Sequence, residues 1–448
     1  MSDLVFQAHH LKTTVLDLIN SDQRSLAWSM IDHYFKKAHT LQHFDVLGHL
    51  SLKADKRDTY LECAEAAYAM AVEPYQRQAA RTNLYMAYNA LNQPEKALFY
   101  IEENLKLMPD DFETLCQKAF NTSLLGYKDV AEQMLFDLTI KYPENAYKIE
   151  AAFSGKHLRE GRTAQGILSF IEAFKPRNRL FEEQLGMKRW TGLITPGKTL
   201  YIDSEGGIGD EIINIRFFDR IKSYGMNPVL VSDNSNYHKH INQVFVRLGY
   251  QVLTDKFSID RNQMWAPMMS IPGYMNLSED QLWTGPYFKP LRNPKNKLEG
   301  TRPRIGIKCS GNPFFGQDEY RKIPLQEMLS CLPKEADIYY IDKEVNHPGT
   351  IDLGDRIESW EDTLDFIDQM DCIVSSCTSL VHAAGAMGKQ TFVAVPIAEY
   401  YIWTTTKRDG SSPWYGDSFY VARQTKVRDW SEPLADIGQR VNKFLWSK

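Results

Sequence analysis

The sequence predicts an α-helical region followed by an α/β region made of two Rossmann-like halves. At 448 residues the chain is too long for one ordinary hydrophobic core. Strand, polar loop and helix patterns follow one another twice, at 199–224 and at 372–395. A recurrence with a period of 34 residues precedes them, in which Leu91, Asn92, Ala97 and Pro109 return as Leu125, Gly126, Ala131 and Pro143.

Residues 1 to about 180 show helical periodicity and few glycines. A 34-residue period is typical of solenoids in which each helix pair buries its apolar face by stacking on the next pair. The segment 83–109 resembles a tetratricopeptide repeat, with weaker copies at 164–176 and 64–74. The alternative is an irregular helical bundle in which the period is fortuitous.

Composition indicates a globular protein. The formal charge is −5, apolar residues make up 43% and charged residues 24%. The chain has no run of 18 apolar residues and its start does not resemble a signal peptide, so we expect a cytoplasmic protein without a membrane span. The stretch 156–189 carries eight Lys or Arg against four Glu. It is either a solvated helix face or a surface for a polyanion.

The first α/β half is expected to begin with a strand at 199–203, a glycine loop at 204–209 and a helix at 210–224. Further strands at 228–231 and 251–253 enclose a helix at 241–248. The segment 289–303, rich in Pro, Asn, Lys and Arg, is predicted to be an interdomain linker.

The second half is expected to contain strands at 304–309, 337–341, 372–374, 391–395 and 419–422, with helices at 325–332, 360–370, 380–387 and 434–444. Small polar residues at 375–379 join a strand to a helix, where backbone N–H groups and the positive end of the helix dipole favour an anion. The alternative is that these residues only cap the helix. The expected domains are 1–190, 197–288 and 303–448.

Five motifs in order carry a family resemblance: EGGIGDEI at Glu205, KCSGNP at Lys308, YRKIP at Tyr320, SSCTSLVHAAGAMG at Ser375 and SPWY at Ser412. Together they resemble bacterial tetratricopeptide-repeat proteins with a glycosyltransferase module similar to the heptosyltransferase family (glycosyltransferase family 9). The resemblance covers about 197–424. It implies a GT-B fold, a nucleotide-diphosphate sugar as co-substrate, no further cofactor and no catalytic metal.

Glycosyl transfer needs a base for the acceptor hydroxyl and positive groups for the departing diphosphate. The resemblance makes Asp210 the expected base, and Glu205 is the reserve candidate. Without the resemblance, Asp210 would be read as a helix cap.

The residues expected to bind the donor lie in the glycine loop, at the start of the second half and at the joint 375–379. They are Gly207, Gly209, Lys308, Asn312, Arg321, Lys322, Ser376, Cys377, Thr378, Ser379 and His382. Cys377 stands where the resembled family commonly has Asp, so the sugar stays open. His382 is alternatively a buried helix histidine. Tyr400, Trp403, Trp414 and Tyr415 would stack on a base or sugar ring, or else belong to the core.

The resemblance therefore implies an inverting, metal-independent glycosyltransferase, and its helical repeats are expected to hold an acceptor, a protein partner or a second copy. The acceptor is a saccharide, a protein, or a hydroxylated base in DNA modification of the phage type. A different class is also open, a non-catalytic scaffold that binds a sugar nucleotide, and so is a sugar-nucleotide epimerase.

Overall fold

The computed structural model describes residues 2–21, 23–172, 180–232, 235, 238–311, 318–342, 347–404, 407 and 409–446. Its contacts divide the chain into two compact units. The first comprises 1–143, 312–320 and 426–428, and the second 144–311, 321–425 and 429–448. The domain bounds expected from the sequence stay a prediction.

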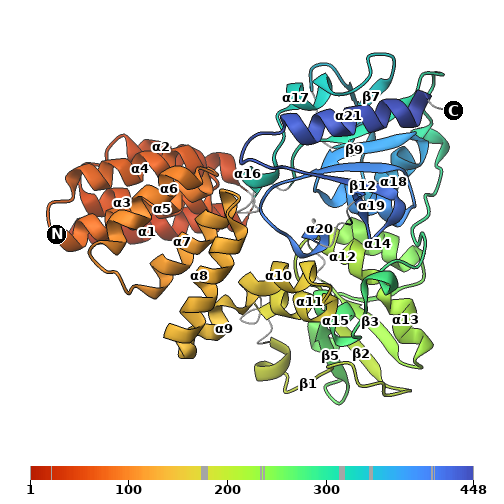
Figure 1. Cartoon of the computed structure of the whole chain (residues 1–448), viewed down its shortest axis with the longest axis horizontal. Helices are drawn as coiled ribbons and strands as arrows, with labels where there is room; N and C mark the ends of the chain where they lie inside the picture. Colours follow the sequence, from red (N-terminus) through yellow and green to blue (C-terminus); the bar gives the residue numbers. More distant parts are fainter. Residues whose placement is uncertain are drawn as a thin grey trace. The chain divides into compact units, whose positions relative to one another are not determined.

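The first unit is a succession of helices, drawn from red to orange in Figure 1. From α3 onward each helix packs against the next, so the apolar faces are buried pair by pair. The helices are α1 (Ser2–Asn20), α2 (Arg24–Phe35), α3 (Leu41–Lys53), α4 (Arg57–Met70), α5 (Pro74–Ala90), α6 (Pro94–Leu105), α7 (Phe112–Leu124) and α8 (Lys128–Lys141).

The 34-residue recurrence corresponds to a repeated helix-turn-helix geometry. The α5–α6 turn has Asn92 at φ 53°, and the α7–α8 turn has Gly126 at φ 92°. Ala97 and Ala131, which lie 34 residues apart, are both buried in the second helix of their pair. The period therefore marks equivalent turns and equivalent core positions, while membership of the tetratricopeptide family stays a prediction.

The second unit begins with α9 (Ala146–Ile149), α10 (Ser154–Arg159) and α11 (Thr163–Glu172), followed by a parallel five-stranded sheet. The strand order is β1-β5-β2-β3-β4. The strands are β1 (Lys188–Arg189), β2 (Thr199–Asp203), β3 (Asn227–Val231), β4 (Gln251–Leu253) and β5 (Met264–Pro267). The helices that follow them are α12 (Ile208–Ile215), α13 (Phe217–Ser223), α14 (Lys239–Arg247) and α15 (Ile271–Tyr274).

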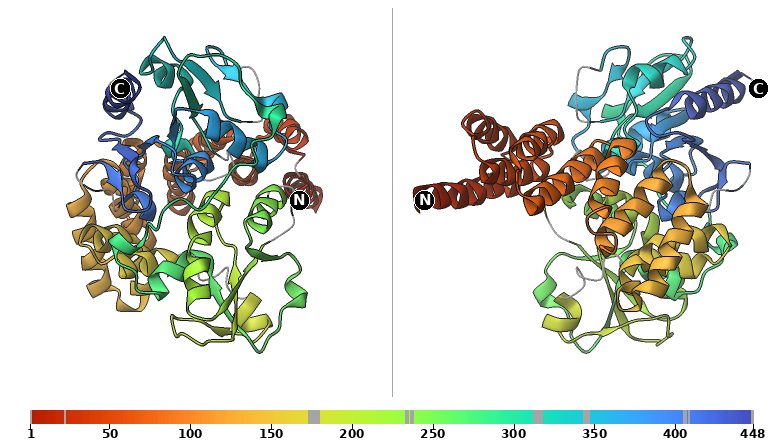
Figure 2. Two further views of the ribbon diagram at one scale, coloured as in Figure 1. Left: turned by 90° about the vertical axis from the view of Figure 1, so that its right-hand side faces the viewer. Right: turned by 60° about the vertical axis from the view of Figure 1, so that its left-hand side comes forward.

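A seven-stranded sheet follows, with order β11-β12-β10-β9-β6-β7-β8, parallel except for β11. Its strands are β6 (Arg304–Lys308), β7 (Asp337–Tyr340), β8 (Ile351–Asp352), β9 (Cys372–Ser376), β10 (Thr391–Val395), β11 (Ser411–Ser412) and β12 (Gly416–Arg423). The helices are α17 (Leu325–Ser330), α18 (Trp360–Gln369), α19 (Ser379–Ala386), α20 (Tyr401–Thr404) and α21 (Ser431–Trp446), while the short α16 (Asp318–Arg321) belongs to the first unit up to Tyr320. Figure 2 shows both sheets, the first in yellow and green and the second in cyan and blue.

Both sheets have Rossmann strand order. Numbered along the chain, β8-β7-β6-β9-β10-β12 is the order 3-2-1-4-5-6, and β4-β3-β2-β5 is its first part, 3-2-1-4. In such sheets the order reverses beside the first strand, and ligands bind outside the carboxyl ends there. The two reversal points lie between β2 and β5 and between β6 and β9. The α/β prediction is confirmed at this level.

One local expectation was wrong, and one strand in the middle of the first sheet was missed. The helix expected over 210–224 is interrupted at Arg216, between α12 and α13. Arg216 donates from Nε to the carbonyl of Ile213 and so occupies an acceptor of the preceding turn. The strand β5 was not expected, because it is short and ends in Pro267.

The segment 289–303 connects the two sheets and is held along α18. Backbone N–H groups of Arg292 and Asn293 donate to the two carboxylate oxygens of Asp365, at 2.5 and 2.7 Å. The buried Asn296 side chain donates to Asp362 at 2.9 Å and to Asp365 at 3.1 Å. A segment anchored in this way is a fixed strap and not a loose linker.

One core cluster spans both halves of the α/β unit, with Ile212 and Ile213 of α12 and Leu380 and Ala383 of α19 among its members. Among the described residues, no helix combines the length and apolar character needed to cross a membrane.

Candidate active site

The first reversal point carries both carboxylates that the sequence singles out. β2 ends at Asp203, and the loop after it leads into α12, whose N-cap is Gly207. Gly206 has φ 92°, and a Cβ atom there would lie 2.6 Å from Oδ2 of Asp210. A glycine is therefore required both by the left-handed backbone and by the approach of Asp210.

Asp210 is held at both carboxylate oxygens. Gly207 N–H donates to Oδ2 at 2.9 Å, and the Tyr400 hydroxyl donates to Oδ1. Burial raises the pKa of Asp210, while these two hydrogen bonds and the charge of Arg321 act in the opposite direction. Asp210 thus caps α12 and is also a fixed carboxylate, so the two sequence interpretations are compatible.

Glu205 lies on the other side of the loop and is 5% exposed. Its Oε1 accepts from Met269 N–H at 3.2 Å, and its buried Oε2 has no hydrogen-bond partner among the described residues. Burial, followed by the charge of Asp203, raises the pKa of Glu205 to about 8. Glu205 is therefore protonated at neutral pH and suits a hydrogen-bond donor better than a base.

The second reversal point brings Lys308 beside the β9 end. Lys308 is paired in register with Ser375, whose hydroxyl donates to the Lys308 carbonyl at 2.7 Å. The Lys308 ammonium forms an ion pair with Asp342, after β7. The hydroxyl of Ser376 is buried and has no hydrogen-bond partner in the described part of the chain. Orphan polar atoms of this kind are expected where a ligand or water binds.

The N-terminus of α19 follows directly. Thr378 is its N-cap residue and Ser379 its first residue. Arg321 donates from a guanidinium nitrogen to the carbonyl of Cys377 at 2.8 Å, which places a cation beside this helix end. The backbone N–H groups of a helix N-terminus, the positive end of its dipole and a guanidinium are the groups that favour an anion, so this helix end is a candidate seat for one.

His382 is a buried, neutral residue one turn further along α19. Its Nδ1 is hydrogen-bonded to the Tyr415 hydroxyl at 2.8 Å, and its ring stacks on Trp403 at 5.2 Å. Burial, followed by the charges of Arg216 and Arg321, lowers its pKa to about 3. Trp403, Trp414 and Tyr415 are at most 2% exposed, so the core interpretation holds for these aromatic residues.

The two helix ends meet. A Cβ atom at Gly209 of α12 would lie 2.8 Å from Cδ2 of His382 and 3.6 Å from Cα of Ser379. The charge of Arg321 acts on both residues: it opposes the rise that burial causes in the pKa of Asp210, and it adds to the fall that burial causes in the pKa of His382. The expected base and the expected anion seat therefore belong to one place in the fold, between the two sheets.

Some expected donor residues lie elsewhere. Lys322 is exposed, and its carbonyl accepts a hydrogen bond from the Trp430 indole at 3.0 Å, on the side of the second sheet that faces α21. Asn312 lies outside the described residues.

Two residues of the site were not assigned their roles from the sequence. Tyr400 was expected either to stack on a base or sugar ring or to belong to the core, and a hydrogen bond from its hydroxyl to Asp210 was not foreseen. Arg216, 5% exposed, donates to the carbonyls of Ile213 at 2.8 Å and Leu282 at 3.3 Å, and also to that of Trp414. Its lone charge within the apolar run IINIRFF was a signal that the sequence analysis left unused.

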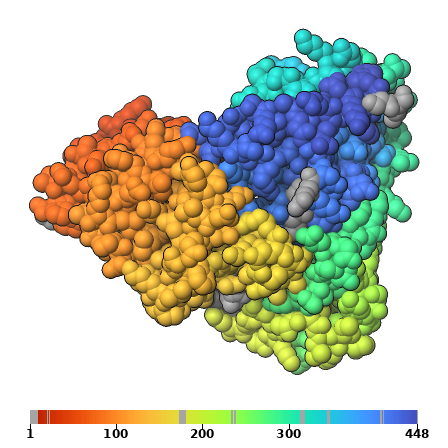
Figure 3. Space-filling model, viewed as in Figure 1, coloured from red at the N-terminus to blue at the C-terminus, as the bar shows by residue number. Residues whose placement is uncertain are grey.

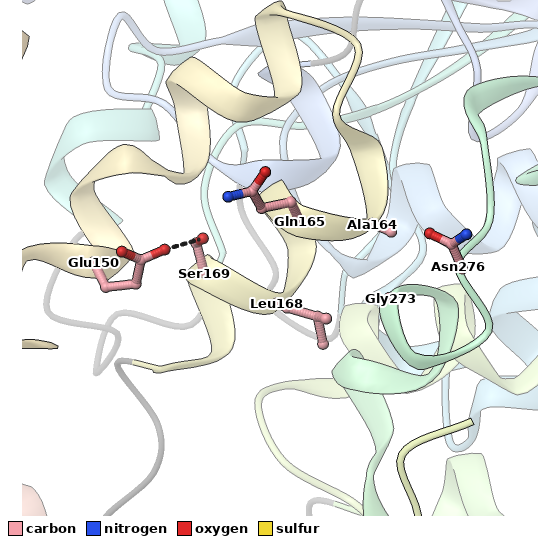
Figure 4. Close-up of a pocket in the computed structure, with 7 residues that line it drawn as sticks. All are labelled: Glu150, Ala164, Gln165, Leu168, Ser169, Gly273 and Asn276. Atoms are coloured by element: carbon pink, nitrogen blue, oxygen red, sulfur yellow. Dashed lines mark hydrogen bonds between the residues drawn. The ribbon is translucent and has the colours of Figure 1, made fainter. Parts of the chain in front are cut away.

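Figure 4 shows a separate pocket of about 430 Å³ in the α/β unit, where α11 faces α15. The Ser169 hydroxyl donates to Glu150 at 2.6 Å at its edge. None of the residues proposed for catalysis or donor binding lines it. It is lined by Glu150, Ala164, Gln165, Leu168, Ser169, Gly273 and Asn276.

No family model matches the chain, and no curated protein matches it either. Among solved structures, a mutant O-GlcNAc transferase of Thermobaculum terrenum is similar at 11% identity and a TM-score of 0.42, covering 99% of this chain and 94% of that one. The ADP-heptose lipopolysaccharide heptosyltransferase II of E. coli is similar at 10% identity and a TM-score of 0.37, over 56% of this chain and 99% of that one. The dodecameric iron-containing heptosyltransferase TibC of enterotoxigenic E. coli, in complex with ADP-D-β-D-heptose, gives 13% identity and a TM-score of 0.36, over 56% and 77%.

Proposed function

We propose that the chain is a glycosyltransferase of the GT-B class, which moves a sugar from a nucleotide-diphosphate sugar to a hydroxyl acceptor. One observation carries the proposal. The N-terminal turns of α12 and α19, each at the reversal point of its own Rossmann-ordered sheet, meet at Gly209. A carboxylate from one half would then lie beside the proposed anion seat of the other half, which is the arrangement that transfer from a diphosphate requires.

In the proposed reaction the Asp210 carboxylate takes the proton of the acceptor hydroxyl. The acceptor oxygen then forms a bond to the anomeric carbon, and the bond between that carbon and the diphosphate oxygen breaks. The nucleoside diphosphate leaves with the bonding electron pair. Arg321 and the backbone N–H groups of the α19 N-terminus stabilise its negative charge. Attack opposite the leaving group inverts the configuration.

Lys308 is proposed to contact the donor from the β6 end, with Asp342 holding its ammonium in place until the donor binds. Cys377 stands at the position where the resembled family has Asp, so a donor sugar that depends on that carboxylate is not expected. No metal is part of the proposed mechanism, in line with the resemblance.

The test is a thermal-shift panel of UDP, ADP, GDP and CDP sugars, since a ligand bound only by the folded state raises the melting temperature. Turnover of the best donor is then measured for the parent and for Asp210→Asn. The proposal expects Asp210→Asn to bind the donor normally and to lose at least about a hundredfold in kcat. Asp219→Asn, at a side chain 66% exposed on α13, is the matched control and keeps full activity.

Absence of any donor shift, or full activity of Asp210→Asn, would refute the proposal. A parent that binds a donor without turning it over would favour the scaffold. Turnover without an acceptor would favour the epimerase.

Transfer to a modified DNA base is the alternative acceptor class, supported only by the basic stretch 156–189. Arg159, Arg162 and Arg189 are each paired with a glutamate, which reduces their attraction for phosphate. Lys175, Arg177 and Arg179 lie outside the described residues. Binding to DNA that weakens steeply with salt would support this acceptor.

A further inference from the structure

The segment that carries Tyr400 is clamped by the helices α10 and α11. Glu399 forms an ion pair with Arg159 of α10. A Cβ atom at Gly155 would lie 2.0 Å from a carboxylate oxygen of Glu399, so only a glycine at this position leaves room for the carboxylate. In Figure 3 the yellow surface around α10 and α11 adjoins the blue surface of the second half, and both helices contact α20.

The aromatic ring of Tyr400 is fixed from the same side. Phe170 of α11 meets it edge to face, with ring centroids 5.3 Å apart, and Phe170 also packs against Tyr401 at 4.8 Å. The Tyr400 carbonyl accepts from Trp403 N–H and from the Thr404 hydroxyl, both at 2.9 Å. The ring and the backbone of Tyr400 are therefore both held, which fixes the position of its hydroxyl oxygen.

The Tyr400 hydroxyl is in hydrogen-bond contact with Asp210, the proposed base. The Tyr400 hydroxyl donates to Oδ1 of Asp210, and Gly207 N–H donates to Oδ2. The pKa of Tyr400 lies well above its ordinary value because of burial and the nearby Asp210, so its hydroxyl keeps the proton that it donates to the carboxylate. A donated hydrogen bond favours the charged form of the carboxylate, which is the form that accepts a proton.

We propose that Tyr400 is the positioning residue of the Asp210 base, and that the α10–α11 pair is a part of the catalytic apparatus because it clamps Tyr400 through Glu399 and Phe170. This inference rests on the proposed glycosyltransferase function. It assigns to α10 and α11, which lie at the start of the second unit, a role other than holding an acceptor.

The decisive measurement is the pH profile of kcat/KM with the donor found in the thermal-shift panel. In Tyr400→Phe the ring still packs on Phe170 and only the hydroxyl is lost. The pKa of Asp210 then rises, so the acid limb is expected to move up by about one pH unit and kcat/KM to fall roughly tenfold below it. Above the limb, activity returns to within about twofold of the parent, and the donor KM is unchanged.

Arg159→Gln tests the clamp and is expected to move the limb in the same direction by a smaller amount. Arg162→Gln removes a cation three positions away that pairs with Glu160, and should leave the profile unchanged. Tyr420→Phe removes a tyrosine–aspartate bond of the same kind, to Asp436, and is the matched control for Tyr400→Phe.

The outcomes separate the two proposals. If Asp210→Asn is inactive while Tyr400→Phe has the parent's profile, the positioning role is refuted and the glycosyltransferase function stands. A loss in Tyr400→Phe that is equal at every pH also refutes it, because a purely structural defect would act in that way. If the parent has no turnover, both proposals fail.

Discussion

Gly209 of α12 lies directly against His382 of α19, at a distance that leaves no room for a methyl group. The contact joins the carboxyl end of the first sheet to that of the second. It therefore determines how closely the Asp210 loop approaches the Thr378 turn.

Gly209→Ala is expected to destabilise the α/β unit by about 1–3 kcal/mol, because the new methyl group would overlap the imidazole. Donor binding should weaken as well, since the two helix ends would separate. Urea unfolding and the thermal-shift assay measure these effects. The double variant Gly209→Ala/His382→Ala should lose less stability than the sum of the two single variants, because the smaller side chain makes room. Strict additivity would contradict the contact.

Glu205 should make the stability pH-dependent. Its folded pKa, about 8, lies above the ordinary value of 4.5, so the folded state binds the proton more tightly. This contribution to stability is complete below pH 4.5 and is lost as the pH rises through about 8. Glu205→Gln should therefore flatten the fall in melting temperature between pH 5 and pH 8. Glu299→Gln, at a side chain 84% exposed, is the control and should keep the slope of the parent.

Arg216 is a buried cation whose donors reach three carbonyls, and it lies over the rings of Tyr287 and Tyr415 at 4.7 and 4.8 Å. Arg216→Met would leave these carbonyls without their donor, so a loss of about 2–4 kcal/mol is expected. Arg216→Lys should recover only a part, because an ammonium does not reproduce the planar fork. If Arg216→Lys and the parent have the same free energy of unfolding in urea, the positive charge alone stabilises this site, and the predicted role of the guanidinium hydrogen bonds is wrong.

The turns of the helical unit offer a matched pair of tests. Gly126→Ala should lower the stability of the helical unit by about 1 kcal/mol or more, because φ 92° is unfavourable for alanine. Asn92→Gly at φ 53° should be nearly neutral, and Asn92→Ala should be destabilising. Thermal unfolding followed by circular dichroism compares the three. A stabilising Gly126→Ala would refute the equivalence of the two turns.

Periodicity was sufficient to find most of the second unit. The strand–helix–strand segment at 372–395 was predicted closely, because a buried parallel strand, a short cap and an alanine-rich helix each have a strong local signature. β5 was missed because four residues that end in proline resemble a loop. The break at Arg216 was missed because side-chain bonds to distant carbonyls leave no periodic trace.

The chemistry of the site was predictable by residue and less so by contact. Asp210 and the Thr378 turn were expected together, and the fold brings them together. The hydrogen-bond partner of Asp210 is Tyr400, which lies 190 positions further along the chain. The partner of His382 is Tyr415, 33 positions further along. An aromatic residue in a loop has the same local pattern whether it meets a ligand, a carboxylate or the core, so the sequence alone left these alternatives open.

The strap at 289–303 has a mechanical consequence. Because Arg292, Asn293 and Asn296 are hydrogen-bonded to Asp362 and Asp365 of α18, a hinge motion within 292–296 would have to break these bonds. We therefore expect that a cross-link between 289–303 and α18 leaves the proposed transferase activity at the level of the parent, and that any opening of the two halves bends the chain at another place.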